Sequence, residues 1–162
     1  MTTRPLEAIR LDTNARNRCE VERLQEAGLS RGAALATIEE HDRQAIEKYG
    51  WTAHHIADDA VPSAHTHGLS ERFGHPDLQV VLPAAVETIQ RLLAPLAEAV
   101  VSGRAFRAGE EALDVFNVPV RFVERRESGR TVLRAIFPDP EGRWPDEQGV
   151  QRGYELQLAH HE

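Results

Sequence analysis

The order of local patterns along the chain predicts an α+β fold, with an N-terminal helical hairpin followed by a small, mostly antiparallel sheet packed on one central helix. Residues 14–48 show apolar positions at helical spacing, whereas 51–82 and 118–137 contain short β-compatible runs separated by turn residues. The segment between these two β-compatible regions has the strongest helical periodicity in the chain. It is therefore the predicted central helix.

Two helices are predicted in the first third of the chain. The first spans 14–27, with Asn14 as its cap and Gly28 at its end, and the second spans 31–48 and ends before Gly50. The first helix carries many charges and few large apolar groups. The hairpin is therefore a candidate surface for a homodimer.

The middle of the chain predicts three strands and then the central helix. The strands are expected at 51–57, 64–69 and 78–82, with the segment 70–76 as a loop rich in glycine and proline. Pro83 suits the first turn of the helix that follows, and Gly103 suits its end. Pro95 lies inside that helix and predicts a kink near Arg91.

The final third predicts a hairpin of strands. Alternating apolar residues at 118–122 and a second run at 131–137 flank the turn Ser128-Gly129. Pro119 indicates an edge or a bulge, and 154–158 is a candidate last strand.

Length and composition indicate one domain. The chain has 162 residues, of which 41% are hydrophobic, and this is enough for a single core. We expect one unit over 1–162, divided into a helical extension over 1–45 and an α+β core over 46–158.

The net charge and the cysteine content limit which partners and which cellular compartment are expected. The net charge of −7 opposes nucleic-acid binding, which needs a basic face. The single cysteine, Cys19, excludes an internal disulfide and favours a reducing cytoplasm. The chain has no apolar N-terminal segment and no stretch long enough to span a bilayer, so neither export nor membrane association is expected.

Several short elements occur in an order that resembles a known family. They are Tyr49-Gly50-Trp51, His67-Gly68-Leu69, Gly74-His75-Pro76-Asp77-Leu78, Phe137-Pro138-Asp139 and Gly142-Arg143-Trp144-Pro145. Together they resemble the bacterial domain-of-unknown-function family 4262 over about 46–145. The resemblance implies a small bacterial α+β domain and no agreed reaction.

This chain departs from the family pattern at two histidines. Members of the family usually read Tyr-Thr-Ile-Gly-Leu where this chain has His65-Thr66-His67-Gly68-Leu69. His75 matches the histidine of the family's His-Pro-acid element, whereas Asp77 replaces the more usual Glu. The resemblance therefore gives His75 more weight than His65 or His67.

The histidines form a candidate metal site. His65 and His67 alternate along one strand and point to the same side, and His54 or His55 on the adjoining strand, with His75, can complete a zinc or iron site. In the alternative interpretation one histidine packs in the core and the others lie on the surface. Because the resemblance requires neither His65 nor His67, we predict that no metal is obligatory.

A ligand site without a metal is the other candidate. Its predicted lining is His67, Gly68, Gly74, His75, Asp77 and Trp144. His75 and Asp77 suit a general acid/base pair, although His75 equally suits a cap of its loop. The two glycines suit either a backbone-lined anion pocket or ordinary turns.

Three functions are compatible with these patterns. The first is a binding protein for a small molecule or a protein partner, with the ligand site just described. The second is a small enzyme, such as a hydrolase, that uses a metal or acid/base chemistry at His54, His65, His67 and His75. The third is a toxin-immunity or defence accessory protein, which small size, acidity and the bacterial family suggest.

Overall fold

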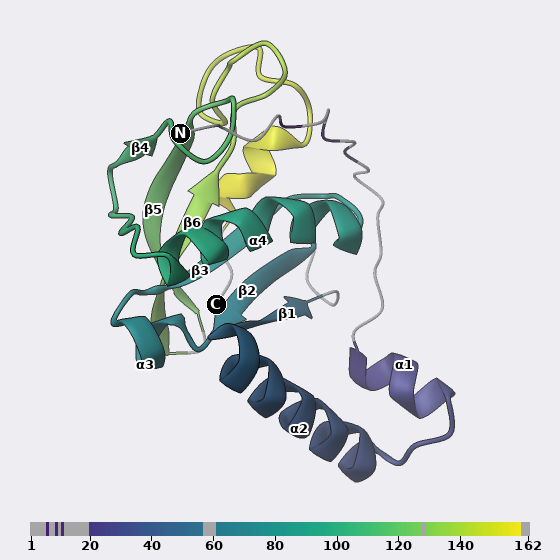
Figure 1. Cartoon of the computed structure of the whole chain (residues 1–162). Helices are drawn as coiled ribbons and strands as arrows, with labels where there is room; N and C mark the ends of the chain where they lie inside the picture. Colours follow the sequence, from purple (N-terminus) through teal and green to yellow (C-terminus); the bar gives the residue numbers. More distant parts are fainter. Residues whose placement is uncertain are drawn as a thin grey trace.

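An open six-stranded mixed sheet forms the centre of the molecule in a computed structural model (Figure 1). The structure describes residues 6, 9, 11, 20–56, 61–127 and 129–159. The strands lie in the order β1-β2-β3-β6-β5-β4. Strands β3 and β6 pair in parallel, and the other neighbouring strands pair antiparallel, as the sequence predicts for a mostly antiparallel sheet. The strands are β1 (Thr52–Ile56), β2 (Ser63–His67), β3 (Asp77–Val81), β4 (Glu111–Ala112), β5 (Val120–Glu127) and β6 (Arg130–Ile136).

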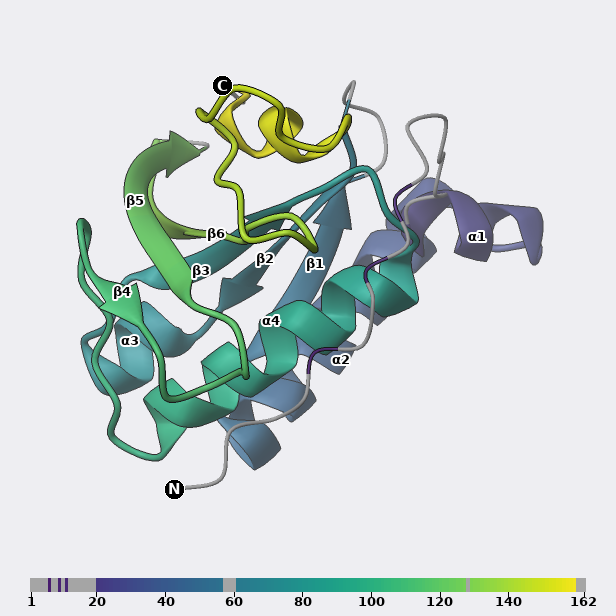
Figure 2. The ribbon, with the colours of Figure 1, turned by 90° about the horizontal axis from the view of Figure 1, so that it is seen from above.

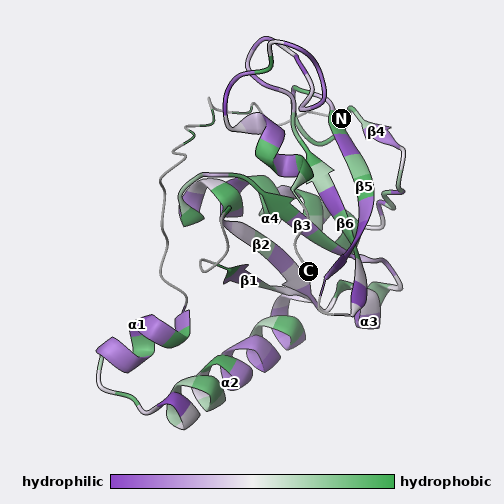
Figure 3. Cartoon of the chain, turned by 180° about the vertical axis from the view of Figure 1, so that it is seen from behind, coloured by the Kyte–Doolittle hydropathy of each residue, from purple (hydrophilic) through white to green (hydrophobic). Residues whose placement is uncertain are grey.

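The predicted central helix is α4 (Val86–Val101), which crosses one face of the sheet (Figure 2). Its apolar side is buried against β2 and β3, and Figure 3 shows both α4 and β3 as largely hydrophobic. The helix continues through Pro95. Its N-cap is Ala85, so the expectation that Pro83 occupies the first turn is wrong. Pro83 instead lies in a tight turn in which the Ala84 amide donates to the Leu82 carbonyl at 2.8 Å.

The N-terminal hairpin consists of α1 (Glu20–Glu26) and α2 (Arg31–Tyr49). The side chain of Ser30 accepts a hydrogen bond from the Ala33 amide and caps α2, and Gly50 ends the helix with a φ of 90°. Asn14, the predicted cap of the first helix, lies outside the described residues. Helix α1 buries no residue and α2 buries only Ala34, so the hairpin contributes little to the core that the structure describes.

Two short segments fold differently from the sequence prediction, and the short strand β4 has no counterpart in it. The expected loop 70–76 contains the helix α3 (Leu69–Phe73), which is too short to show a helical period and ends at Gly74 with a φ of 64°. The expected last strand is instead the 3-10 helix η1 (Tyr154–Leu158). There the side-chain amide of Gln157 bonds to both the N–H and the C=O of Phe137, each at 2.8 Å. A side chain therefore pairs with the end of β6 where a strand was expected.

The sheet has one apolar and one polar face. Ala64, Leu78 and Leu133 face α4 in the main core, to which Ile9 also belongs. The cross-strand register sets His54, His65, Gln79 and Arg134 in a row on the opposite face of β1, β2, β3 and β6. Within the described residues, no helix is long and apolar enough to cross a membrane.

The difference between the two helical regions predicts different responses to truncation. Leu92 on α4 is 2% exposed, so Leu92→Ala should lower the free energy of unfolding by about 2–5 kcal/mol. Leu24→Ala on α1 should lower it by less, because that side chain is only partly buried. Urea denaturation of both variants measures the difference. A larger loss for Leu24→Ala would show that α1 packs against more of the protein, or against a second copy.

Candidate functional site

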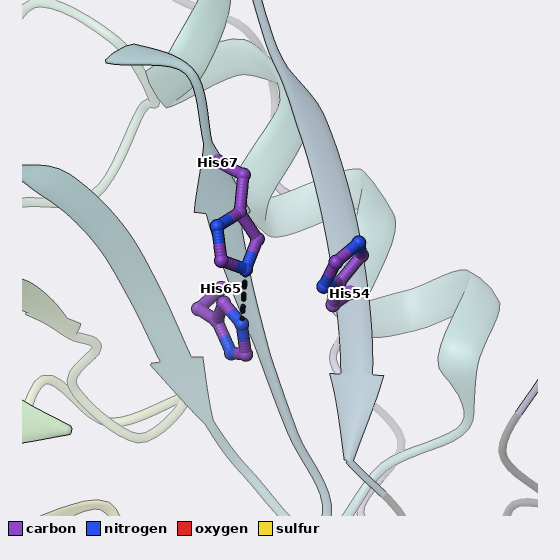
Figure 4. Close-up of side chains that lie close together, drawn as sticks. All are labelled: His54, His65 and His67. Atoms are coloured by element: carbon purple, nitrogen blue, oxygen red, sulfur yellow. Dashed lines mark hydrogen bonds between the residues drawn. The ribbon is translucent and has the colours of Figure 1, made fainter. Parts of the chain in front are cut away.

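Three histidine side chains meet on the polar face of the sheet, opposite α4 (Figure 4). His54 lies on β1 directly opposite His65 on β2, and His67 lies two residues further along β2. Each offers a ring nitrogen, and these three nitrogens lie within 4.8 Å of one another. The Nε2 atoms of His65 and His67 are 2.9 Å apart, so one imidazole donates a hydrogen bond to the other.

Two of the three histidines have a carboxylate beside a ring nitrogen. Asp42 of α2 places its Oδ2 atom 2.5 Å from Nε2 of His54. Glu127, at the end of β5, places its Oε1 atom 3.5 Å from Nδ1 of His65. That separation exceeds a good hydrogen bond, and Nδ1 has no hydrogen-bond partner among the described residues. Histidines that bind metals characteristically have a carboxylate on the ring nitrogen that does not bind the metal.

Burial keeps the two histidines of β2 neutral. Removal from water, followed by the charges of the neighbouring His67 and Arg130, lowers the pKa of His65 to about 3. Burial, followed by Arg130, lowers the pKa of His67 to about 4. Both side chains are therefore uncharged at pH 7, and the neutral imidazole is the form that binds a metal ion.

A buried chain of polar side chains holds Glu127 in place. Gln79 donates through Nε2 to Oε2 of Glu127 at 2.8 Å and accepts a hydrogen bond from Nε of Arg134, also at 2.8 Å. Arg134 in turn donates to the backbone carbonyl of Gln157. Burial lowers the pKa of Arg134 to about 10, so this guanidinium still carries its charge at pH 7. The position of Glu127 beside His65 is thus fixed from β3, β6 and η1.

His75 lies outside the three-histidine group of the described chain. Its Nδ1 atom donates to the Pro76 carbonyl at 2.7 Å, and its Nε2 atom accepts a hydrogen bond from the Phe106 amide at 2.9 Å. Both ring nitrogens thus join the loop before β3 to the segment after α4. His55, the alternative to His54 as a predicted metal ligand, points to the α4 face and contacts Gln90.

Asp77 forms hydrogen bonds and an ion pair with groups near the end of β2. Its Oδ1 atom accepts hydrogen bonds from the Thr66 hydroxyl at 2.7 Å and from the Leu69 amide at 3.2 Å. Its Oδ2 atom pairs with Arg130 at 2.8 Å. Asp77 therefore ties β2 and the start of α3 to β6, and the structure gives His75 and Asp77 separate sets of partners.

The two candidate glycines differ in their surroundings. Gly68 has a φ of 104°, and a Cβ added there would lie 2.9 Å from the carbonyl oxygen of Gly50. The close approach of Gly68 to Gly50 thus brings the end of β2 against the start of β1. Gly74 also has a positive φ, but an added Cβ would meet nothing within 4 Å.

Trp144 lies toward the other end of the sheet. The guanidinium of Arg121 stacks on its ring at 3.8 Å. Arg121 is opposite Ile136 on β6, whereas Asp77, near the histidines, is level with Val132. The structure therefore does not bring Trp144 together with His67, His75 and Asp77.

Asp42 and Glu127 are site residues that the sequence pattern does not predict. Each is one acid among many on a polar helix or on a strand of alternating charges, and each is distant in sequence from the histidine it contacts. The general rule that a metal-binding histidine has a carboxylate partner predicts that some acid lies near each histidine. The rule does not identify which Asp or Glu that is.

The fold and the three-histidine group define an α+β domain with a candidate metal centre. The chain belongs to the family DUF4262, a domain of unknown function, whose model matches residues 45–131. No curated protein and no solved structure shows a significant match. The matched range includes all three histidines and Glu127, whereas Asp42 precedes it.

The contact at Gly68 predicts a large effect of substitution. Gly68→Val should lower the free energy of unfolding by roughly 1–3 kcal/mol or more, because the side chain combines backbone strain with a clash against Gly50. Gly74→Val is the matched control, since it has the backbone strain without the close contact. Equal losses in urea denaturation for the two variants would contradict the role of the Gly68–Gly50 contact.

The buried histidines predict a loss of stability in acid. The pKa values of His65 and His67 lie below the ordinary 6.5, so below that pH the unfolded chain binds protons that the folded chain does not. Stability should be complete above about pH 6.5 and fall as the pH drops toward 4. His67→Gln should reduce this slope by about 1.4 kcal/mol per pH unit, which corresponds to one proton. Denaturation at several pH values in the presence of a chelator measures the slope, and an unchanged slope would contradict the assignment.

Proposed function

We propose that the protein binds a divalent transition metal, with zinc as the first ion to test, through His54, His65 and His67. One observation carries the proposal: three ring nitrogens lie within 4.8 Å of one another, and two of the rings have a carboxylate beside them. Imidazole nitrogens suit zinc, copper, nickel and iron. Three protein ligands leave a fourth position of a tetrahedral zinc ion for water or another ligand.

The distances fit such an ion after a small adjustment. Zinc binds histidine nitrogen at about 2.0–2.1 Å, so two ligands of a tetrahedral ion are separated by roughly 3.3 Å. The Nε2 atoms of His65 and His67 are 2.9 Å apart, and all three ligand nitrogens lie within 4.8 Å of one another, so the separations are close to that value. Small rotations of the side chains would therefore bring the three nitrogens into the ligand geometry.

The ring contacts assign a ligand atom to each histidine. Asp42 engages Nε2 of His54 and so leaves Nδ1 for the metal. Glu127 lies beside Nδ1 of His65 and leaves Nε2, which already faces Nε2 of His67. The carboxylate of Asp42 also offsets part of the positive charge of the ion.

The three histidines are a better candidate for ligand binding than a site centred on His75 and Asp77. The polar atoms of those two side chains bind groups of the protein itself. The resemblance to the family requires neither His65 nor His67. The metal site is therefore proposed for this chain alone and not for DUF4262 as a whole.

Zinc titration of the untagged protein tests the proposal. After treatment with a chelator, the wild type should bind one equivalent of zinc in calorimetry. At a zinc concentration 100 times the Kd, binding should stabilise the fold by about 2.7 kcal/mol. For a chain of this length, that corresponds to an increase in Tm of roughly 5–10 °C.

Two histidine variants make the test specific. His67→Ala should lose the binding and the increase in Tm. His41→Ala removes an exposed histidine of α2 and should retain both. Absence of zinc, copper, nickel and iron binding by the wild type, or equal binding by the two variants, would overturn the proposal.

A further inference from the structure

The N-terminal hairpin leans away from the sheet and touches it mainly through the second half of α2 (Figure 1). One attachment is the C-terminal end of α2, where Arg72 donates to the Ile46 carbonyl at 3.2 Å and Gly68 lies close to Gly50. The other attachment is Asp42, which contacts Nε2 of His54 at 2.5 Å and the Thr52 hydroxyl at 3.4 Å. Asp42 and Gly50 are eight residues apart, or about 12 Å along a helix.

The Asp42 contact is a second point at which α2 is attached to the sheet. With the end near Gly50 alone, the helix has a single point of attachment about which it can turn. The contact between Asp42 and His54 provides a second point, about two turns away. It is also the contact that joins the helical extension to the three-histidine group.

We infer that metal binding at the three histidines fixes α2, and with it the N-terminal hairpin, against β1 through Asp42. The inference rests on the proposed metal site. An ion on Nδ1 of His54 withdraws electron density from the ring, and the Nε2 proton becomes a stronger donor to the carboxylate. The bond between His54 and Asp42 therefore becomes stronger when the metal is bound.

Thermodynamic linkage sets the size of the effect. Loss of the outer partner of a metal-binding histidine typically weakens metal binding by about 10- to 100-fold. Because coupling between two equilibria is reciprocal, the metal shifts the docking of α2 onto β1 by the same factor. The affinity for zinc and the docking of α2 therefore both depend on the contact between Asp42 and His54.

The movement of α2 would also alter a groove on the other side of β1. This groove of about 610 Å³ lies between α2, β1 and α4. His41, Ala45 and Tyr49 form its α2 wall, opposite Leu93 of α4. The metal-dependent position of α2 therefore sets the width of the groove.

Hydrogen exchange of the full chain tests the inference, with zinc itself as the probe. In the wild type, saturating zinc should slow exchange of the α2 amides at 42–49 by roughly 10- to 100-fold. Asp42→Asn should bind zinc more weakly by a similar factor and show no slowing at saturation. Glu39→Gln, at an exposed position of the same helix, should behave as the wild type.

The outcomes separate the inference from the proposed function. Zinc binding by the wild type without slower exchange in α2 would overturn the inference and leave the metal site intact. Full affinity and full slowing in Asp42→Asn would also overturn it. Failure of the wild type to bind zinc in calorimetry would overturn the proposed function itself. Unchanged protection of the α4 amides shows that Asp42→Asn is folded.

Discussion

The register between β1 and β2 is the constraint on which the candidate site depends. It sets His54 opposite His65, with both side chains on the face away from α4. Because neighbouring side chains in a strand point to opposite faces, a slip of one residue would turn His54 toward the core. Ala53 would then move from the apolar side to the polar side. The burial of Ala64 against α4 and the placement of the three histidines are thus consequences of the same pairing.

Backbone contact at the strand ends accompanies this register. Gly68 follows β2 immediately, and its lack of a side chain lets the end of β2 approach Gly50 and Trp51, which precede β1. Asp77 acts from the other side by binding Thr66 and the first amide of α3. The contacts of Gly68 and Asp77 therefore hold this edge of the sheet in place beside the three histidines.

Burial of the histidines on the polar face carries an energetic cost. His65 has a buried Nδ1 atom without a hydrogen-bond partner in the described chain, and burial opposes protonation of both histidines of β2. Buried titratable groups of this kind are concentrated at functional sites. Glu127 and Arg134, by contrast, share Gln79 between them, so their charges are compensated inside the protein.

The sequence by itself determined the class of fold, the central helix, most strands and the shared side of His65 and His67. These features follow from local periods of two residues in strands and 3.6 residues in helices. Such periods can be recognised in the sequence without knowing which segments pack against each other. Only the tertiary structure decided that Asp42 and Glu127 join the histidines, and that His75 and Asp77 bond to backbone and neighbouring side chains. It also separated Trp144 from the histidines and replaced the expected last strand with η1. A hydrogen-bond partner is selected by proximity in the folded chain, and no local pattern records which of many acids will be near.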